Sequence, residues 1–317
     1  MSVFTPVSRE QLSGFLSAFE LGRLIDHRDI LGGTENSNFF VATERGEYVL
    51  TLIERGPTAD LPFLVELLDR LHQAGLPVPY AIRDRQGRAL HQLNGRPALL
   101  QPRLFGTHVG AADASHCHAV GRALAQLHEA SVGSGLQRRS DRGLDWMLQQ
   151  TERLRQRSDT RARQLLEEMV PVLERLHSQR PALPEAVLHG DLFRDNVLFE
   201  GHHLAGIIDF HNAFSGWALY DLAICVNDWC LTAEGVLDAR LAEALLTGYA
   251  SRRRFTPLEA ENWPDLLRVA ALRFWLSRQL AADRYGEQGG VLIKAPAHFR
   301  ELLERHRRIT VGLPLAL

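Results

Sequence analysis

The chain has 317 residues, which is long enough to bury a large core and to form two lobes. Its hydrophobic content of 45% and its charged content of 23% are those of an ordinary soluble globular protein. A net charge of −2 gives no bulk electrostatic reason to bind nucleic acid or an anionic membrane, and the three cysteines show neither metal-ligand spacing nor the even count of a disulfide framework.

The N-terminal residues 1–6 lack a basic segment followed by an apolar core, so no secretory signal is visible. No apolar run along the chain reaches the length of a membrane span. We therefore expect a cytoplasmic protein with no nucleic-acid partner and no membrane partner.

The first hundred residues predict mainly strands. Ser8 and Gln11 form a capping-box pattern that opens a helix continuing to about Glu20. Apolar stretches at residues 39–43 and 48–54 flank a turn and predict a hairpin. Leucines at helical spacing predict a helix over residues 61–73 that ends at Gly75, and the dipeptide Asn94-Gly95 predicts a second hairpin, between residues 89–93 and 97–101.

After Pro102 the pattern becomes helical. Helices are predicted over residues 114–130, 144–156, 161–179, 217–231, 238–252, 264–285 and 297–309. A strand-rich front followed by a helical back predicts an α+β protein with two lobes, residues 1–101 and residues 102–317.

The stretch at residues 188–199 (LHGDLFRDNVLF) carries the strongest chemical signal. An apolar strand at residues 186–188 delivers His189 and Asp191 to a loop, and Asn196 opens a second apolar strand. A further strand, residues 204–208, ends in Asp209. The pattern His-x-Asp-x-x-x-x-Asn followed by Asp-Phe is that of the catalytic loop and metal-binding aspartate of kinases.

Phosphoryl transfer from a nucleotide explains why these residue types occur together. Asp191 can accept the proton of an attacking hydroxyl, while the side-chain oxygens of Asn196 and Asp209 suit Mg²⁺, which prefers oxygen ligands. The structural alternative is an Asx-rich turn between two buried strands, in which Asp191 and Asn196 only cap backbone groups.

Together these motifs resemble the kinase-like small-molecule phosphotransferases, the family that includes aminoglycoside phosphotransferases and choline kinases. Gly190 lies between the histidine and the aspartate, as is common in that family, and residues 121–128 (GRALAQLH) resemble the first large helix of its back lobe. The resemblance covers nearly the whole chain. It implies a two-lobe protein-kinase-like fold, with an antiparallel β-sheet in the N-lobe and a mainly helical C-lobe.

A narrower resemblance is to the bacterial homoserine kinases of this fold. It rests on residues 48–52 (YVLTL), 219–230 (LYDLAICVNDWC) and 271–278 (ALRFWLSR). The resemblance implies ATP-dependent phosphorylation of the side-chain hydroxyl of L-homoserine, within threonine biosynthesis, with ATP and Mg²⁺ as cofactors.

Nucleotide contacts are expected from three places in the front lobe. The polar, glycine-bearing segment at residues 32–38 would cover the phosphates, although an ordinary turn is the alternative. Thr51 stands where protein kinases place the lysine of the third strand. The segment at residues 101–104 would present backbone groups to adenine, and because Pro102 has no N–H, the donor must be a neighbour such as Arg103 or Leu104. The predicted nucleotide-binding residues are Gly33, Thr34, Asn36, Asn38, Thr51, Gln101, Arg103 and Leu104.

Thr51 allows two interpretations, because it offers a hydroxyl and no charge. Either the chain is a non-catalytic pseudokinase, or Mg²⁺ and other donors neutralise the phosphates. The homoserine kinase resemblance itself carries threonine here, which favours an active enzyme. Glu66 on the following helix then has no lysine partner and is expected to be a solvated charge on the helix surface.

Homoserine carries an ammonium group and a carboxylate, so its site needs an acid and a fixed cation. Asp228 is the predicted ammonium ligand, with Trp229 as a pocket wall; a buried capping carboxylate beside a core tryptophan is the alternative. Arg273 or Arg278, in an otherwise apolar helix, would bind the carboxylate, and an internal salt bridge would satisfy either one equally well.

The remaining loop residues have supporting roles. His189 is expected to support the catalytic loop, and the resemblance implies that Asp221 forms hydrogen bonds with the backbone of that loop. Asp195 is a candidate substrate neighbour or a solvated turn carboxylate. The leading hypothesis is thus a homoserine kinase; the alternatives are a kinase for another amino alcohol or an aminoglycoside, and a nucleotide-binding pseudokinase.

Overall fold

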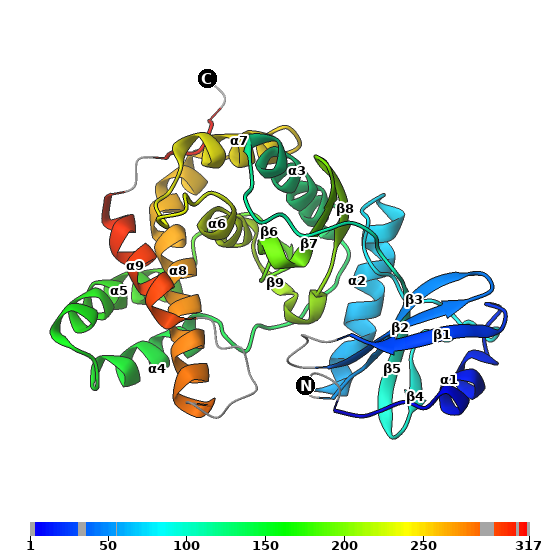
Figure 1. The fold of residues 1–317 in the computed structure, drawn as a ribbon. Helices are drawn as coiled ribbons and strands as arrows, with labels where there is room; N and C mark the ends of the chain where they lie inside the picture. The colour runs from blue at the N-terminus through cyan, green and yellow to red at the C-terminus, as the bar shows by residue number, and fades with distance from the viewer. Residues whose placement is uncertain (1–3, 31–35, 55, 286–294, 309–310, 316–317) are drawn as a thin grey trace. The chain divides into compact units, whose positions relative to one another are not determined.

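The computed structural model describes residues 4–30, 36–54, 56–285, 295–308 and 311–315. Contacts divide the chain into two compact units, residues 1–106 with 205–208, and residues 107–204 with 209–317. Figure 1 shows the strands of the first unit in blue and cyan and the helices of the second unit in green to red.

The first unit is built on a five-stranded antiparallel sheet with the strand order β1-β2-β3-β5-β4. Its strands are β1 (Leu24–Asp29), β2 (Ser37–Thr43), β3 (Gly46–Leu52), β4 (His91–Leu93) and β5 (Arg96–Pro102). Burial alternates along β2, so Phe39 and Val41 point into the core, where they pack with Leu12 and Leu16 of α1 (Arg9–Leu16). A 3₁₀ turn (Thr58–Asp60) leads into α2 (Leu61–Gln73), the second helix of this unit.

Local sequence signals set the ends of these elements. Ser8 caps α1, since its hydroxyl accepts from the Gln11 N–H while the Gln11 side chain accepts from the Ser8 N–H, which confirms the predicted capping box. The helix ends at Leu16, earlier than predicted, where the Ser17 hydroxyl donates back to the Gly14 carbonyl. Asn94 and Gly95 both adopt positive φ, as the predicted two-residue turn between β4 and β5 requires.

The second unit is mainly helical. Its helices are α3 (Ala114–Ser131), α4 (Leu144–Arg155), α5 (Thr160–Gln179), α6 (Ala218–Trp229), α7 (Ala239–Ala250), α8 (Pro257–Tyr285) and α9 (Pro296–Arg305). Strand β6 (Glu185–Leu188) pairs antiparallel with β9 (Phe214–Trp217). Its other elements are β7 (Val197–Glu200) and 3₁₀ turns at Arg194–Asn196, Phe210–Asn212 and His306–Arg308; β8 (His203–Ile207) begins in this unit and ends within residues 205–208, which belong to the first.

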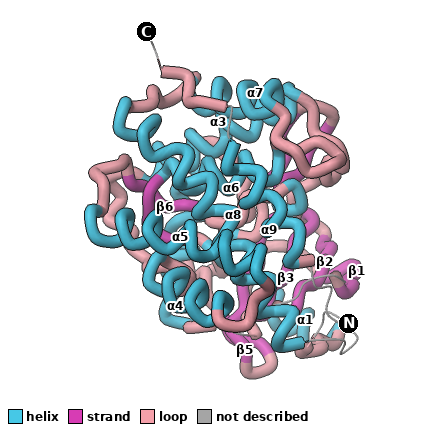
Figure 2. Tube along the Cα trace, turned by 90° about the vertical axis from the view of Figure 1, so that its left-hand side faces the viewer, coloured by secondary structure: helices cyan, strands magenta, loops and turns pink. Residues whose placement is uncertain are grey.

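Helix α6 forms the interior of the second unit. Every residue of α6 except Asp228 is buried, and the helix packs against α3, α7 and α8. Figure 2 shows α6 in the middle of this unit with α8 beside it. Around it, α3 and α7 approach closely at Gly121, where an added Cβ would lie 2.0 Å from the Leu245 carbonyl oxygen. A side chain at this position would therefore force the two helices apart.

Two predicted boundaries were wrong and two strands were missed. Helix α8 begins at Pro257, ahead of the predicted start at Pro264, because Thr256 and Glu259 cap it reciprocally and Pro264 lies inside the helix. Strand β1 was missed because its sequence is largely polar, and the short β9 because it follows a turn without an apolar run.

The three cysteines are free and buried. Among the described residues, no helix combines the length and apolar character needed to cross a bilayer.

Candidate active site in the second unit

The loop that follows β6 carries the predicted catalytic residues. Ala186, Val187 and Leu188 are buried, and β6 is fixed by its pairing with β9, so the loop starts from a rigid strand. Gly190 adopts φ +76°, and a Cβ there would lie 2.9 Å from the Asn212 carbonyl oxygen and from the Phe214 ring. Glycine is therefore required by both conformation and space at this position.

Asp221 of α6 holds the first part of the loop. Its carboxylate accepts the backbone N–H groups of His189 at 2.7 Å and Gly190 at 2.9 Å, and lies 3.1 Å from Nε2 of His128. Burial acts to raise the pKa of Asp221, but the His128 contact and these hydrogen bonds outweigh it and hold the pKa below its usual value. The loop-supporting role implied for Asp221 is confirmed by these contacts.

The C-terminal end of α6 holds the rest of the loop. The indole N–H of Trp229, a fully buried residue, donates to the Leu192 carbonyl at 3.0 Å. The Asp228 carboxylate accepts the Arg194 N–H at 2.8 Å and lies 3.4 Å from Nε of the Arg194 side chain. These contacts give Trp229 and Asp228 a supporting function; their roles as pocket wall and ammonium ligand stay predictions.

Asp191 and Asn196 lie together in this loop. The Asn196 amide donates from Nδ2 to the Asp191 carbonyl at 2.8 Å. This bond uses the amide N–H of Asn196, and Oδ1 accepts no hydrogen bond from any residue within the described ranges. An amide oxygen presented in this way is suited to a hard cation such as Mg²⁺.

The turn that starts at Asp209 packs against the same loop. The Phe210 ring lies 4.7 Å from the His189 ring, centroid to centroid, and His189 is fully buried. Asp209 adopts a left-handed conformation with φ 63°, a region that aspartate enters more readily than most other non-glycine residues. Its carboxylate is exposed and, like the amide oxygen of Asn196, is of the type that Mg²⁺ prefers; their joint role as metal ligands stays a prediction. Asp195 is likewise exposed.

Arg138 was not singled out from the sequence, yet it fixes this turn. Its guanidinium donates to the His211 carbonyl at 2.7 Å and to the Ala213 carbonyl at 2.9 Å. Nothing near Arg138 in the sequence marks it, because its partners lie more than seventy residues away. Such a residue becomes visible only once the chain has folded.

In the first unit, the structure brings two of the predicted nucleotide residues together. Thr51 and Asn38 are cross-strand neighbours on β3 and β2, and the Thr51 hydroxyl donates to Oδ1 of Asn38 at 2.7 Å. Asn36 accepts the Glu54 N–H through Oδ1 at 3.2 Å. Gly33 and Thr34 lie outside the described residues. Glu66 is exposed and pairs with Arg70 one turn along α2, as expected for a solvated surface charge.

The segment at residues 101–104 presents fewer free backbone groups than predicted. The Arg103 N–H donates to the Glu47 carbonyl at 3.0 Å, so Arg103 is not the free donor for adenine. Its side chain pairs with the Glu47 carboxylate at 2.6 Å and lies over the Phe40 ring. The Gln101 side chain donates to the Pro79 carbonyl. The N–H of Leu104, in contrast, has no partner among the described residues and remains the candidate donor.

The two arginines of α8 differ in their surroundings. Arg273 is 6% exposed and Arg278 is half-buried, and burial lowers the pKa of both guanidinium groups. Arg273 lies 3.9 Å above the Phe274 ring and Arg278 lies 4.3 Å above the Phe299 ring. Each guanidinium interacts electrostatically with Asp191. Neither forms the predicted alternative, an internal salt bridge, with any described residue.

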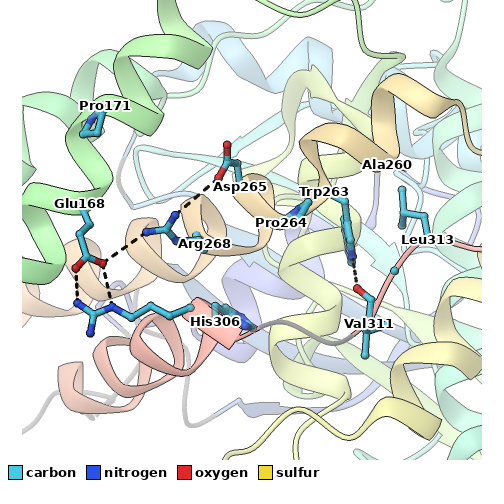
Figure 3. A pocket seen from close by; sticks show the side chains of 12 residues that line it. Glu168, Pro171, Ala260, Trp263, Pro264, Asp265, Arg268, His306, Val311 and Leu313 are labelled. Atoms are coloured by element: carbon cyan, nitrogen blue, oxygen red, sulfur yellow. Dashed lines mark hydrogen bonds and ion pairs between the residues drawn. The ribbon is translucent and has the colours of Figure 1, made fainter.

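A cavity of about 910 Å³ lies elsewhere in the second unit and contains none of the predicted site residues. Trp263 and Pro264 form part of its wall, and Arg268 lies between the carboxylates of Glu168 and Asp265, as Figure 3 shows. Its other polar groups largely satisfy one another, since Arg307 pairs with Glu168 at 2.6 Å. The size of this cavity therefore does not identify it as the catalytic site.

A second cluster of titratable groups, Asp113, His116 and His202, brings its ligand atoms within 4.8 Å of one another. Asp113 caps α3 by accepting the N–H groups of Ser115 and His116. The hydrogen bond from the His116 N–H, together with contacts to the His116 and His202 imidazoles, holds the pKa of Asp113 well below its usual range. Burial acts in the opposite direction and is outweighed. Helix capping accounts for this arrangement, and none of the predicted catalytic residues belongs to it.

Comparison with known proteins identifies the family of the chain. Residues 26–255 match the model of a phosphotransferase enzyme family. The homoserine kinase of Pseudomonas aeruginosa (strain UCBPP-PA14) is 57% identical over 317 residues, which cover 100% of both chains. An aminopropanol kinase associated with a microcompartment has a TM-score of 0.69 at 19% identity, covering 95% of this chain and 98% of that one. An amicoumacin kinase solved with AMP-PNP and Ca²⁺ has a TM-score of 0.68 at 14% identity, covering 98% and 96%.

These likenesses confirm the predicted fold class, a protein-kinase-like fold with an antiparallel N-terminal sheet and a helical C-terminal part. The amicoumacin kinase structure holds an adenine nucleotide analogue and a divalent cation. With a full-length relative at 57% identity and a family model that matches most of its length, the chain belongs to the phosphotransferase enzyme family and, within it, to the homoserine kinases.

Proposed function

We propose that this chain transfers the γ-phosphoryl group of ATP to the side-chain hydroxyl of L-homoserine, with Asp191 as the base. The observation that carries the proposal is the loop at residues 189–196, which α6 holds at His189, Gly190, Leu192 and Arg194. The substrate follows from the full-length likeness to a homoserine kinase. Such a reaction belongs to threonine biosynthesis, and a cytoplasmic location is proposed with it.

In this reaction the homoserine oxygen bonds to the γ-phosphorus while the bond from that phosphorus to the bridging oxygen of ADP breaks. An alcohol is far more basic than a carboxylate, so its proton passes to Asp191 late, after most of the charge has shifted to the phosphoryl group. Until then the Asp191 carboxylate orients the hydroxyl. His189 supports the loop from its buried position and does not act as a base.

Asn196 and Asp209 would hold Mg²⁺ through their side-chain oxygens. When bound, the cation neutralises charge on the phosphates. In the first unit, the residues proposed for the phosphates are Gly33, Thr34, Asn36, Asn38 and Thr51. The Leu104 N–H is the proposed adenine donor, with Gln101 and Arg103 fixing the backbone around it. Residues 1–101 would thus form the nucleotide lobe and residues 102–317 the catalytic and substrate lobe.

The substrate's charged groups are proposed to bind in the second unit. Asp228 would accept the ammonium group, with Asp195 and Trp229 near it. Arg273 or Arg278 would bind the carboxylate, because each guanidinium lacks an ion-pair partner among the described residues and each interacts with the Asp191 charge.

An ADP-release assay over L-homoserine, choline and an aminoglycoside tests this proposal. Release with L-homoserine alone supports it, whereas release with choline or the aminoglycoside but not with L-homoserine would replace it by a kinase for another amino alcohol or an aminoglycoside. Nucleotide binding without release on any substrate would indicate a pseudokinase, the alternative raised by the absence of a lysine at Thr51.

A further inference from the structure

Buried polar groups without a partner are rare in folded proteins, and each one calls for an explanation. Among the described residues four side-chain atoms are of this kind: Thr151 Oγ1, Tyr220 Oη, Arg268 Nε and Ser277 Oγ. Three of the four lie on α6 and α8, the helices that carry Asp221 and Arg273, and the two hydroxyls among them belong to Tyr220 and Ser277.

Helix geometry places these groups close to Arg273. Ser277 follows Arg273 by four residues on α8, so the two side chains share one face of that helix. Tyr220 lies on α6, which packs against α8, and its hydroxyl interacts electrostatically with the Arg273 guanidinium. Arg273 itself has no hydrogen bond and no ion pair within the described part of the chain.

This group of side chains adjoins the catalytic loop. The Tyr220 ring packs edge-on against Phe214 with a centroid separation of 6.4 Å, and Phe214 is the residue whose ring closes the space beside Gly190. Arg273 interacts electrostatically with Asp191, the proposed base. A substrate whose hydroxyl is at Asp191 would therefore extend toward Tyr220 and Arg273.

The chemistry of the group favours an anion. A buried guanidinium without a counter-charge is costly, and a carboxylate matches its geometry with two parallel hydrogen bonds. Burial raises the pKa of Tyr220 to about 12, so its hydroxyl stays protonated and can donate to the same carboxylate. Arg278 is a weaker candidate because it is less buried and already interacts with three carboxylates, those of Asp228, Asp191 and Asp195.

We propose that the Tyr220 hydroxyl and the Arg273 guanidinium, with the Ser277 hydroxyl beside them, form the subsite for the substrate's carboxylate and so select an α-amino acid over the corresponding amino alcohol. The inference deepens the proposed function and rests on it, since it names the residues that distinguish L-homoserine from 3-amino-1-propanol, which is homoserine without its carboxylate. Tyr220 is thereby a specificity-determining residue that the sequence motifs do not mark.

The test compares kcat/KM for L-homoserine with kcat/KM for 3-amino-1-propanol in the wild-type chain and in Tyr220→Phe. Loss of a hydrogen bond to a charged group predicts a drop of about 10- to 100-fold for L-homoserine and little change for the amino alcohol. Tyr80→Phe is the matched control, because Tyr80 lies in the first unit against His72. An equal drop for both substrates, or an unchanged ratio, would overturn the inference.

A stability measurement separates this role from a structural one. Because the Tyr220 hydroxyl has no partner among the residues that the structure describes, Tyr220→Phe should leave the melting temperature of the substrate-free protein unchanged or raise it. L-Homoserine should raise the melting temperature of the wild type and raise it less in Tyr220→Phe. A lower melting temperature in the substrate-free variant would mean that the hydroxyl serves the fold.

The two proposals fail in different ways. Turnover of L-homoserine by the wild type with no change of substrate ratio in Tyr220→Phe removes the subsite and leaves the proposed function intact. No turnover of L-homoserine by the wild type removes the proposed function, and the thermal shift with L-homoserine as probe then decides the subsite. A shift that Tyr220→Phe abolishes would support it, and the absence of any shift in the wild type would remove both.

Discussion

The catalytic loop at residues 189–196 and the segment of α8 from Arg273 to Arg278 differ in how their polar groups are used. In the loop, α6 supplies a partner to the backbone groups of four residues. On α8, the guanidinium of Arg273 and the hydroxyl of Ser277 have no hydrogen-bond partner among the described residues. Polar groups that have hydrogen-bond partners hold the loop in one geometry, whereas buried polar groups without partners are available to a ligand. The loop therefore serves to position the catalytic residues, and the α8 segment serves to bind the substrate.

The largest effect is expected at Asp191, the proposed base. Asp191→Asn keeps the size of the side chain and removes the proton acceptor, so kcat should fall by about 10²- to 10⁴-fold. The contact with Asn196 is kept in this variant, because Asn196 bonds to the backbone carbonyl of residue 191. Steady-state kinetics and a melting curve provide the measurement, and full turnover by this variant would contradict the assignment of the base.

Removing the support of the loop should have the next largest effect. Asp221→Asn leaves a single acceptor oxygen for two backbone N–H groups and turns an NH₂ group toward His189, Gly190 or His128. We expect a loss of about 3–5 kcal/mol in the free energy of unfolding, as for other buried charged groups that lose a partner, together with a lower kcat. Urea denaturation measures the first quantity.

Asp145→Asn is the control for this variant. Asp145 is 89% exposed and pairs with His177 at the surface, so its substitution should change the stability by no more than about 0.5 kcal/mol. If Asp221→Asn were as mild as this control, the claim that α6 positions the loop would fail.

The difference between the two regions also explains what the sequence alone reveals. The residues of the loop are close together in the chain, so the spacing of Asp191, Asn196 and Asp209 can be recognised from the sequence alone. The roles of Tyr220 and Arg138 cannot be recognised in this way. The role of Tyr220 depends on which face of α6 packs against α8, and that of Arg138 depends on a turn more than seventy residues away. The same holds for secondary structure. Helix α2 begins and ends where its leucine spacing predicts, because that spacing is a local pattern. Strand β1 is polar and pairs with β2, so its sequence has no apolar pattern that would predict a strand.

A further prediction concerns how α6 is itself held. His306 is 4% exposed, and its Nε2 lies 2.6 Å from Oδ1 of Asn227 on α6. Asn227 donates its amide to the Leu267 carbonyl, so its oxygen must accept from His306. Burial, together with the positive charge of Arg268, lowers the pKa of His306 to about 4.

The sign of the pH dependence follows from this lowered pKa. In the unfolded chain the imidazole binds a proton near pH 6.5, whereas in the folded chain it does so only near pH 4, so the stabilisation is complete above 6.5 and is lost as the pH falls through that window. Between pH 7 and pH 5 this residue should account for about 2 kcal/mol of lost stability. His306→Gln should flatten the pH profile by that amount, and the exposed His203→Gln should leave it unchanged.

The smallest expected change in kcat tests the hydrogen bond between Trp229 and the Leu192 carbonyl. Trp229→Phe keeps an aromatic ring in the core but removes the N–H that donates to the Leu192 carbonyl, and it leaves a small cavity beside Phe199. The missing hydrogen bond should cost about 1 kcal/mol and the cavity a similar amount. Because Asp221 and Asp228 still hold the loop on either side of Leu192, kcat should fall only a few-fold, and the ratio of kcat/KM for L-homoserine over 3-amino-1-propanol should stay constant. A change in that ratio would show that Trp229 contacts the substrate as a pocket wall, and the division between a satisfied positioning region and an unsatisfied binding region would then no longer hold at this residue.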